Sequence, residues 1–240
     1  MTQSSDSFTK VAEFYDELMK PVPYRMWVSY YLLLLAMQGI KPKTMLDMCC
    51  GTGTMTELMF REGFEVDGFD LSADMIEVAR KKAERKKMPL RYEVQDATQL
   101  DMQKTYDACF SFFDSFNNIT DPAQFRQALE SAYRHLQPGG SFIFDLNTAY
   151  AFQAKLFNQQ DLRKDTKVRY RWRGEWDKQT RLITVNMKFW VGDAVIEELH
   201  IQRAYELDEV VDMLLDIGFE DVRFFHSYTL QPPGSKSDRI

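Results

Sequence analysis

The chain has 240 residues, a formal net charge of −6 and 45% hydrophobic residues. This length suits one domain with room for an insertion, and the hydrophobic content excludes a disordered chain. The negative charge argues against nucleic-acid or anionic-membrane partners, because phosphate contacts need a basic surface. Three cysteines form no disulfide framework and make no zinc-site spacing with the three histidines, so we expect a cytoplasmic protein without a metal.

The first elements predict neither a signal peptide nor a membrane span. Residues 1–7 are polar and contain no lysine. The apolar stretch Trp27–Met37 is shorter than the ~20 residues that cross a bilayer, so we expect a helix packed on the core.

Strands and helices alternate between Lys43 and Leu146. The pattern predicts strands at 44–48, 65–69, 90–94, 106–112 and 141–146. It predicts helices at 55–61, at 73–83 after an N-cap at Ser72, and from Pro122 to about Leu136 after an N-cap at Asp121. This order is typical of an α/β, Rossmann-like, doubly wound and mostly parallel sheet with helices on both faces.

Beyond Tyr150 the pattern changes to longer alternating segments at 168–176, 181–191 and 194–205. They predict an antiparallel three-stranded insertion with one buried face, which carries Val168, Tyr170, Trp172 and Trp176. A helix at 207–217, a strand at 221–226 and a C-terminal loop are expected to follow.

The segment from Met45 to Thr54 carries the clearest functional pattern. Its apolar strand ends in Asp47, and a turn with Gly51 and Gly53 leads into a helix. Glycines let a ligand approach the backbone, and the start of a helix offers unpaired N–H groups. Asp70 ends the second expected strand, where an acid can accept both hydroxyls of a ribose.

Two nucleoside cofactors compete for this site. A nicotinamide dinucleotide favours a third glycine, but Thr56 stands there, and Asp47 would repel a pyrophosphate. The same carboxylate suits the ammonium group of an amino acid, which favours S-adenosylmethionine. An NAD-dependent oxidoreductase and a non-catalytic S-adenosylmethionine-binding protein stay open as alternatives.

Several segments together resemble the class I S-adenosylmethionine-dependent methyltransferases. The likeness is to small bacterial members with an antiparallel insertion after the fifth strand, a group that also resembles the amino-sugar N,N-dimethyltransferases. It covers nearly the whole chain and rests on seven segments, namely Phe14–Asp16, Leu46–Gly53, Asp70–Met75, Gln95–Ala97, Asp114–Asn117, Leu136–Gly140 and His200–Tyr205.

The resemblance implies cofactor contacts, which we describe by the part of S-adenosylmethionine that each group would meet. The methionine end would be lined by Asp47, Cys49, Gly51 and Gly53. The ribose would be held by Asp70, and the adenine by Leu71, Met75, Asp96 and Ala97. The sulfonium would lie beside Phe112 and Phe113, under a cover made by Tyr15, Tyr24 and Trp27.

The expected acceptor is a small molecule methylated on nitrogen or oxygen by in-line displacement. The chain lacks the Pro-Pro-Tyr and Pro-Cys motifs of DNA methyltransferases. Candidate substrate contacts are Asp114, Asn117 and His200, and an oxygen nucleophile would use His200, Tyr15 or Asp114 as its base. Strict alternation places His200 opposite Leu199 and Ile201, which predicts an exposed imidazole.

These expectations divide the chain into four parts. Residues 1–42 form helices that cover the cofactor, residues 43–150 the α/β core, residues 151–205 a substrate lid, and residues 206–240 a helix and strand that complete the core.

Two features depart from the family pattern. Cys49 replaces the first glycine of the turn, and the chain ends at Ile240, so that a final strand is either cut from this sequence or missing, which would leave an open sheet edge.

Overall fold

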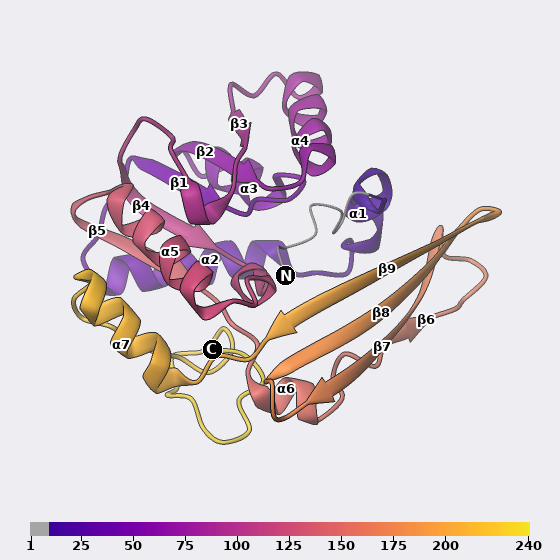
Figure 1. Ribbon diagram of the computed structural model, residues 1–240. Coiled ribbons are helices and arrows are strands. Elements are labelled where there is room, and N and C mark those ends of the chain that lie inside the picture. Colours follow the sequence, from indigo (N-terminus) through magenta and orange to yellow (C-terminus); the bar gives the residue numbers. More distant parts are fainter. Residues whose placement is uncertain (1–9) are drawn as a thin grey trace.

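The computed structural model describes residues 10–240 and has a layered core beside a separate antiparallel sheet (Figure 1). The core sheet is parallel, in the order β3-β2-β1-β4-β5. Its strands are β1 (Thr44–Met48), β2 (Glu65–Asp70), β3 (Arg91–Val94), β4 (Tyr106–Ser111) and β5 (Leu136–Phe144). The predicted doubly wound, Rossmann-like sheet is confirmed.

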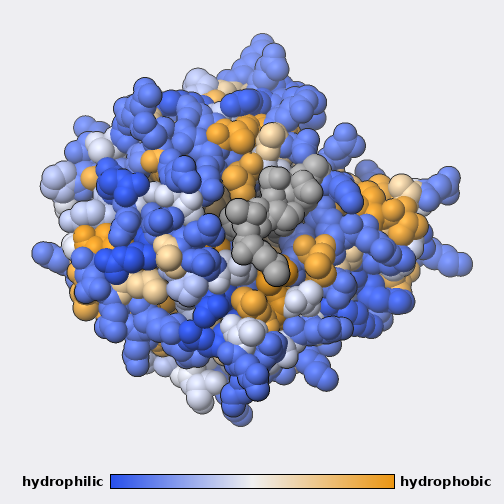
Figure 2. Space-filling model, viewed as in Figure 1, coloured by the Kyte–Doolittle hydropathy of each residue, from blue (hydrophilic) through white to orange (hydrophobic). Residues whose placement is uncertain are grey.

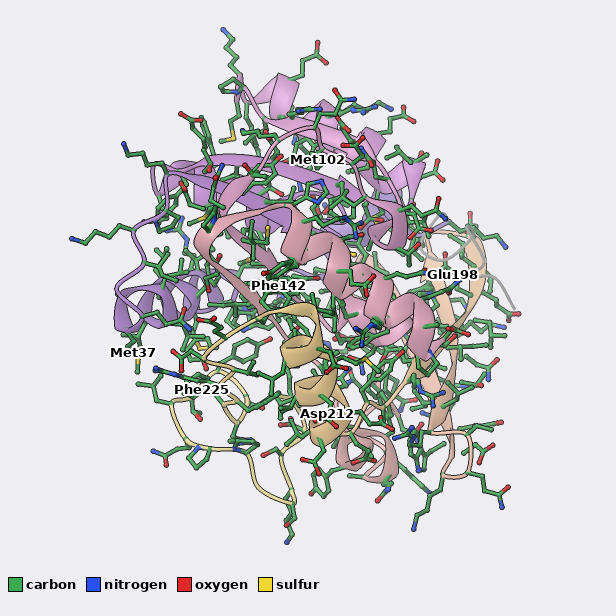
Figure 3. All side chains as sticks on the ribbon, turned by 60° about the vertical axis from the view of Figure 1, so that its left-hand side comes forward. Met37, Met102, Phe142, Glu198, Asp212 and Phe225 are labelled. Carbon is green, nitrogen blue, oxygen red and sulfur yellow. The ribbon has the colours of Figure 1, made fainter. Side chains whose placement is uncertain are left out.

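Helices cover both faces of the core sheet because successive strand residues point to opposite sides. On the face of Met45 lie α2 (Tyr24–Met37), α3 (Thr54–Arg61) and α4 (Ala73–Arg85). On the face of Leu46 lie α5 (Pro122–Arg134) and α7 (Leu207–Ile217). Figure 3 shows Phe142 of β5 in the layer beneath α5 and α7.

The predicted helix caps are confirmed. Ser72 Oγ accepts a hydrogen bond from Met75 N, and Asp121 Oδ1 accepts from Ala123 N and Gln124 N. Strand β1 pairs with β2 on one side and β4 on the other, so the chain reverses its winding direction at β1. The carboxyl ends of these strands therefore frame a crevice, where open α/β sheets bind ligands.

The insertion forms a sheet that we call the lid, in the order β6-β7-β8-β9. Its strands are β6 (Gln160–Asp161), β7 (Val168–Asp177), β8 (Leu182–Val191) and β9 (Ala194–Arg203), after the short helix α6 (Ala149–Gln153). The sequence predicted three strands, and the two-residue β6 makes a fourth. The predicted apolar face of β7 packs inward with Ile183, Val185 and Phe189 of β8.

Helix α1 (Ala12–Leu18) lies between the lid and α4. Phe14 packs edge-on against Phe189 of β8, at 5.6 Å between ring centroids. The opposite face of β9 carries the exposed side chains of Val195, Leu199 and Ile201. Figure 2 shows apolar surface on the lid, at the right of the view.

The strand predicted at 221–226 is wrong. The chain there is irregular, and Asp221 (φ 54°) and Ser227 (φ 24°) bound it in left-handed conformations that break an extended strand. Val222 and Phe224 still pack against the core. The alternating apolar residues at 221–226 therefore indicated burial and not strand pairing, because a segment can be buried without pairing to a neighbouring strand.

Strand β5 is the edge of the core sheet, and no strand of the described residues pairs with its outer side. A groove of about 890 Å³ runs along this edge, between the C-terminal part of α2 and the segment at 219–228.

Within residues 10–240, no helix has the length and apolar character to cross a membrane. The same residues contain no group of three His, Cys, Asp or Glu side chains that could hold a metal ion.

Asn117, in the 3-10 helix η2 (Ser115–Asn118), is fully buried between the core and the lid. Its Nδ2 donates to the carbonyls of Asn147 and Arg203 at 3.0 and 2.8 Å, and its Oδ1 accepts from Asn147 N at 2.9 Å. Its amide thus joins the end of β4, the chain after β5 and the end of β9.

We predict that Asn117→Ala lowers the free energy of unfolding by about 2–4 kcal/mol, because it leaves buried backbone groups without partners. Urea unfolding measures this change. The matched control Asn186→Ala, on the exposed face of β8, should change stability by less than about 0.5 kcal/mol. Equal effects of the two variants would contradict the assignment.

Candidate active site

A hollow of about 100 Å³ lies at the carboxyl ends of β1, β2 and β4. Tyr15 of α1 and Gln202, near the end of β9, also line it. The lining residues predicted from sequence are Tyr15, Tyr24, Asp47, Cys49, Gly51, Asp70, Met75, Phe112, Phe113 and Asp114. The fold therefore brings together residues that are up to 99 positions apart in the chain, from Tyr15 to Asp114.

The turn after β1 takes backbone conformations that glycine favours. Gly51 (φ 54°) has open space where a Cβ would lie, so the hollow meets bare backbone there. Gly53 (φ 77°) is required for a different reason, because a Cβ at this position would collide with the Tyr92 hydroxyl. Cys49 (φ 60°) holds the same left-handed region as a non-glycine residue, which marks the departure from the family pattern as a strained position.

Asp70 organises this turn from the tip of β2. Its Oδ2 accepts from Gly51 N at 2.8 Å and its Oδ1 from Ser72 N at 2.9 Å. Burial raises the pKa of Asp70, and the two backbone N–H groups oppose that rise. The carboxylate is therefore fixed in place at the rim of the hollow, where it can accept hydroxyl donors.

Asp47 lies deeper, at the end of β1, and is 3% exposed. Its pKa is raised to about 7, and burial is the largest cause. The charge of Asp70 also raises the pKa, and a 2.6 Å hydrogen bond from the Thr56 hydroxyl opposes the rise. This carboxyl group therefore changes its charge near neutral pH.

A polar latch holds α1 against the turn. Asp16 accepts a 2.6 Å hydrogen bond from the Thr52 hydroxyl and pairs with Lys82 Nζ, also at 2.6 Å. Tyr15, the preceding residue, lines the hollow. Burial, followed by the charges of Tyr24 and Asp114, raises the pKa of Tyr15 well above its usual range, so its phenol keeps its proton at neutral pH.

Aromatic rings wall the side of the hollow nearest α2. Trp27 stacks on Tyr228 at 4.5 Å between centroids and lies 3.9 Å from the Phe113 ring. Tyr24 packs on Phe113 at 5.0 Å. Trp27 thus supports the lining residues Tyr24 and Phe113 from behind.

The remaining predicted residues do not line the hollow. They are Trp27, Gly53, Leu71, Asp96, Ala97, Asn117 and His200. Asp96 caps the 3-10 helix η1 (Ala97–Gln99) through Thr98 N, which fixes its carboxylate beside that turn. Asn117 is occupied in the bonds that join core and lid, which favours a scaffolding role over contact with a substrate.

The predicted exposure of His200 is wrong. Its side chain is 2% exposed, on the inner face of β9, and its Nε2 lies 2.7 Å from Glu198 Oε2. His200 shares this face with the buried Val185, its register partner on β8, while Leu199 and Ile201 point to solvent. Figure 3 shows Glu198 on the lid. The alternation was read correctly, but the polar side of the strand is the buried one.

Sequence reasoning missed several functional candidates. Thr52 and Thr54 lie within the turn, and Gln202 closes the hollow from β9. Asp16 and Arg239 act on lining residues from α1 and the C-terminal segment. Gln202 and Asp16 belonged to segments of the family likeness, but Arg239 had no signal, because its contact with Asp114 spans 125 residues.

Comparisons with known proteins agree with this geometry. Residues 45–140 match the family described as a methyltransferase domain. A protein of Geobacillus sp. (strain WCH70), whose name describes a methyltransferase, is 29% identical over 98% of this chain and 97% of its own length. The crystal structure of a S-adenosylmethionine-dependent methyltransferase from Clostridium acetobutylicum ATCC 824 has a TM-score of 0.84 and 25% identity, covering 98% of this chain and 96% of that one.

A third similarity concerns the fold alone. The sugar N-methyltransferase KedS8 from Streptoalloteichus sp. ATCC 53650 has a TM-score of 0.74 at 16% identity, covering 91% of this chain and 88% of that protein.

The fold is that of the class I S-adenosylmethionine-dependent methyltransferases, and residues 45–140 match a methyltransferase domain. The similarity to the Geobacillus and Clostridium proteins covers 98% of this chain, so it includes the lid.

The residues present fit S-adenosylmethionine. Gly51 leaves room for close approach to the backbone, Asp70 offers acceptors to a ribose, and Asp47 offers a negative charge to an amino-acid end.

We predict that affinity for S-adenosylhomocysteine rises about tenfold from pH 6 to pH 8 and then levels off. The ammonium group of this ligand favours ionised Asp47, whose pKa is about 7 in the free protein. Isothermal titration calorimetry across this range measures the effect. A wild-type affinity that is flat from pH 6 to pH 8 would contradict the prediction.

Asp47→Asn is the matched variant. Folding raises the pKa of Asp47, so its ionisation costs the ligand-free fold stability progressively as pH rises from about 4 to about 7. We expect the variant to be more stable than the wild type at pH 8 by thermal unfolding, equal to it near pH 4, and to bind S-adenosylhomocysteine weakly with no pH slope. A pH slope retained by Asp47→Asn would assign the titration to another group.

We predict that Asp16→Asn weakens S-adenosylhomocysteine binding roughly three- to tenfold, because α1 loses charged hydrogen bonds to Thr52 and Lys82 that hold it closed. Glu13→Gln, an exposed change on the same helix, is the control and should leave the dissociation constant unchanged. If both variants bind like the wild type, α1 is no latch.

Proposed function

We propose that this chain transfers a methyl group from S-adenosylmethionine to a small-molecule amine by in-line displacement, with a hydroxyl acceptor as the second candidate. The observation that carries the proposal is the meeting of Gly51, Asp70 and Asp114 around one hollow under the lid. When bound there, S-adenosylmethionine supplies a methyl group on a sulfonium that a nucleophile can displace. The protein then has to hold the acceptor, orient it and exclude water.

The proton chemistry of the site favours an amine. Among the described residues, the three candidate bases are all engaged or protonated. His200 pairs with Glu198 away from the hollow, Tyr15 keeps its phenolic proton, and both oxygens of Asp114 accept hydrogen bonds. A neutral amine can attack without a base, whereas a hydroxyl needs one. The sugar N-methyltransferase similar in fold supports the same acceptor class.

The cover and the lid are suited to exclude water. A volume of about 100 Å³ is far below the 300–1,000 Å³ of ordinary ligand sites, so a ligand has to displace part of the enclosure. Helix α1 is the element suited to move, because it is only seven residues long and Asp16, which ties it to the turn, is partly exposed. We propose that α1 opens for the cofactor and closes again before transfer.

We predict that labelled methyl groups pass from S-adenosylmethionine to members of a panel of amino sugars, and not to simple phenols. His200→Ala should keep amine turnover within about fivefold of the wild type, since the imidazole does not reach the hollow. Scintillation counting of the extracted products measures both rates. Phenol turnover that His200→Ala abolishes would establish a base-assisted O-methyltransferase instead.

A further inference from the structure

Gln202, near the end of β9, carries an unused hydrogen-bond acceptor beside the hollow. The residue is 6% exposed and lines the hollow. Its Nε2 donates to Asp114 Oδ2 at 2.6 Å, while its Oε1 is buried and has no hydrogen-bond partner within residues 10–240. A buried oxygen without a donor destabilises a fold, so an oxygen kept in this state beside a ligand site points to a ligand donor.

The orientation of this amide follows from the charge of Asp114. An ionised carboxylate only accepts hydrogen bonds, so the glutamine must turn its NH₂ group toward Asp114 and its oxygen away from it. Burial raises the pKa of Asp114, and the Arg239 guanidinium lowers it. The cation that favours the ionised form of Asp114 therefore also favours this direction of the Gln202 oxygen.

Arg239 is held beside Asp114 by contacts of its own side chain and by backbone hydrogen bonds of the next residue, Ile240. Its Nη2 donates to Asp114 Oδ1 at 2.8 Å, and its Nη1 pairs with Asp145, just after β5. Ile240 N and O both bond to Leu146, which ties the C-terminal segment to the same strand end. The guanidinium thus meets both carboxylates at the carboxyl edge of the sheet.

Asp114 itself sits on a backbone that needs such support. Phe113 (φ 67°) and Asp114 (φ 49°) are consecutive non-glycine residues in the left-handed region, directly after β4. Asp114 N donates to Asp145 Oδ1 at 2.9 Å, so Arg239 and Asp145 together hold this turn. Core, lid and C-terminal segment therefore converge on one carboxylate.

We propose that Gln202 binds the methyl acceptor by accepting an N–H or O–H hydrogen bond at Oε1, and that Arg239 and Asp114 are positioning residues for this amide. The inference rests on the proposed function and refines it. The site selects acceptors that carry at least one polar hydrogen, so it takes primary and secondary amines or alcohols and disfavours neutral tertiary amines, which have no N–H.

The first test follows the side-chain NH₂ signals of Gln202 by NMR in the complex with S-adenosylhomocysteine, assigned by their loss in Gln202→Leu. At pH 7 we expect signals shifted from those of free glutamine and slow exchange with solvent. Arg239→Lys should preserve them, and Arg239→Met should lose them at a higher pH than the wild type as Asp114 takes up a proton. Wild-type signals like those of free glutamine would overturn the proposal.

The second test uses methylammonium and tetramethylammonium as probes of the same complex, because only the first carries N–H donors. The wild type should bind methylammonium more tightly, and Gln202→Leu should weaken that binding about tenfold and remove the preference. Gln179→Leu, an exposed change in the β7–β8 turn, is the matched control and should behave like the wild type. Unchanged binding in Gln202→Leu, or no methylammonium binding at all, would overturn the proposal.

The affinity for S-adenosylhomocysteine separates this inference from the function on which it rests. We expect the wild type and the control Gln179→Leu to bind that ligand within about twofold of each other. If the wild type itself fails to bind it, the proposed function fails. If binding is normal but the probes show no preference, only the role of Gln202 fails.

Discussion

Negative charge gathered at the carboxyl ends of β1, β2 and β4 is the constraint on which this structure depends. Burial raises the pKa of Asp47, Asp70 and Asp114, so each carboxylate costs the ligand-free fold stability. Of these three carboxylates, only Asp114 has a cationic partner among the described residues, Arg239. Asp47 and Asp70 have hydroxyl and N–H donors instead, and a ligand that brings positive charge supplies what the fold leaves uncompensated.

The same charges explain why distant parts of the chain are needed for one small site. The lid reaches Asp114 through Gln202, the C-terminal segment reaches it through Arg239, and β4 carries it. Helix α1 reaches the neighbouring turn through Asp16. The enclosure is therefore a property of the whole fold, and the core that matches the family supplies only its floor.

Local sequence patterns were sufficient to predict the core and the floor of the site. These patterns act over only a few residues, so they can be recognised from the sequence alone. They are the alternating apolar residues, the capping side chains of Ser72 and Asp121, and the turn at Gly51. The alternation of side chains along β9 was also predictable from sequence. Which face of β9 is buried was not predictable, and for that reason the predicted exposure of His200 was wrong. The pairing of residues 221–226 and the contact of Arg239 with Asp114 depend on distant partners, and no local pattern encodes them.

The central claim is that these carboxylates form the site of a nucleoside that carries an amino-acid cation. Calorimetric titration of the wild-type protein at pH 8 with S-adenosylhomocysteine, adenosine and NAD tests it most directly. We expect S-adenosylhomocysteine to bind, adenosine to bind at least about tenfold more weakly because it lacks the ammonium group, and NAD not to bind. Binding of NAD, or equal affinities for adenosine and S-adenosylhomocysteine, would contradict the account.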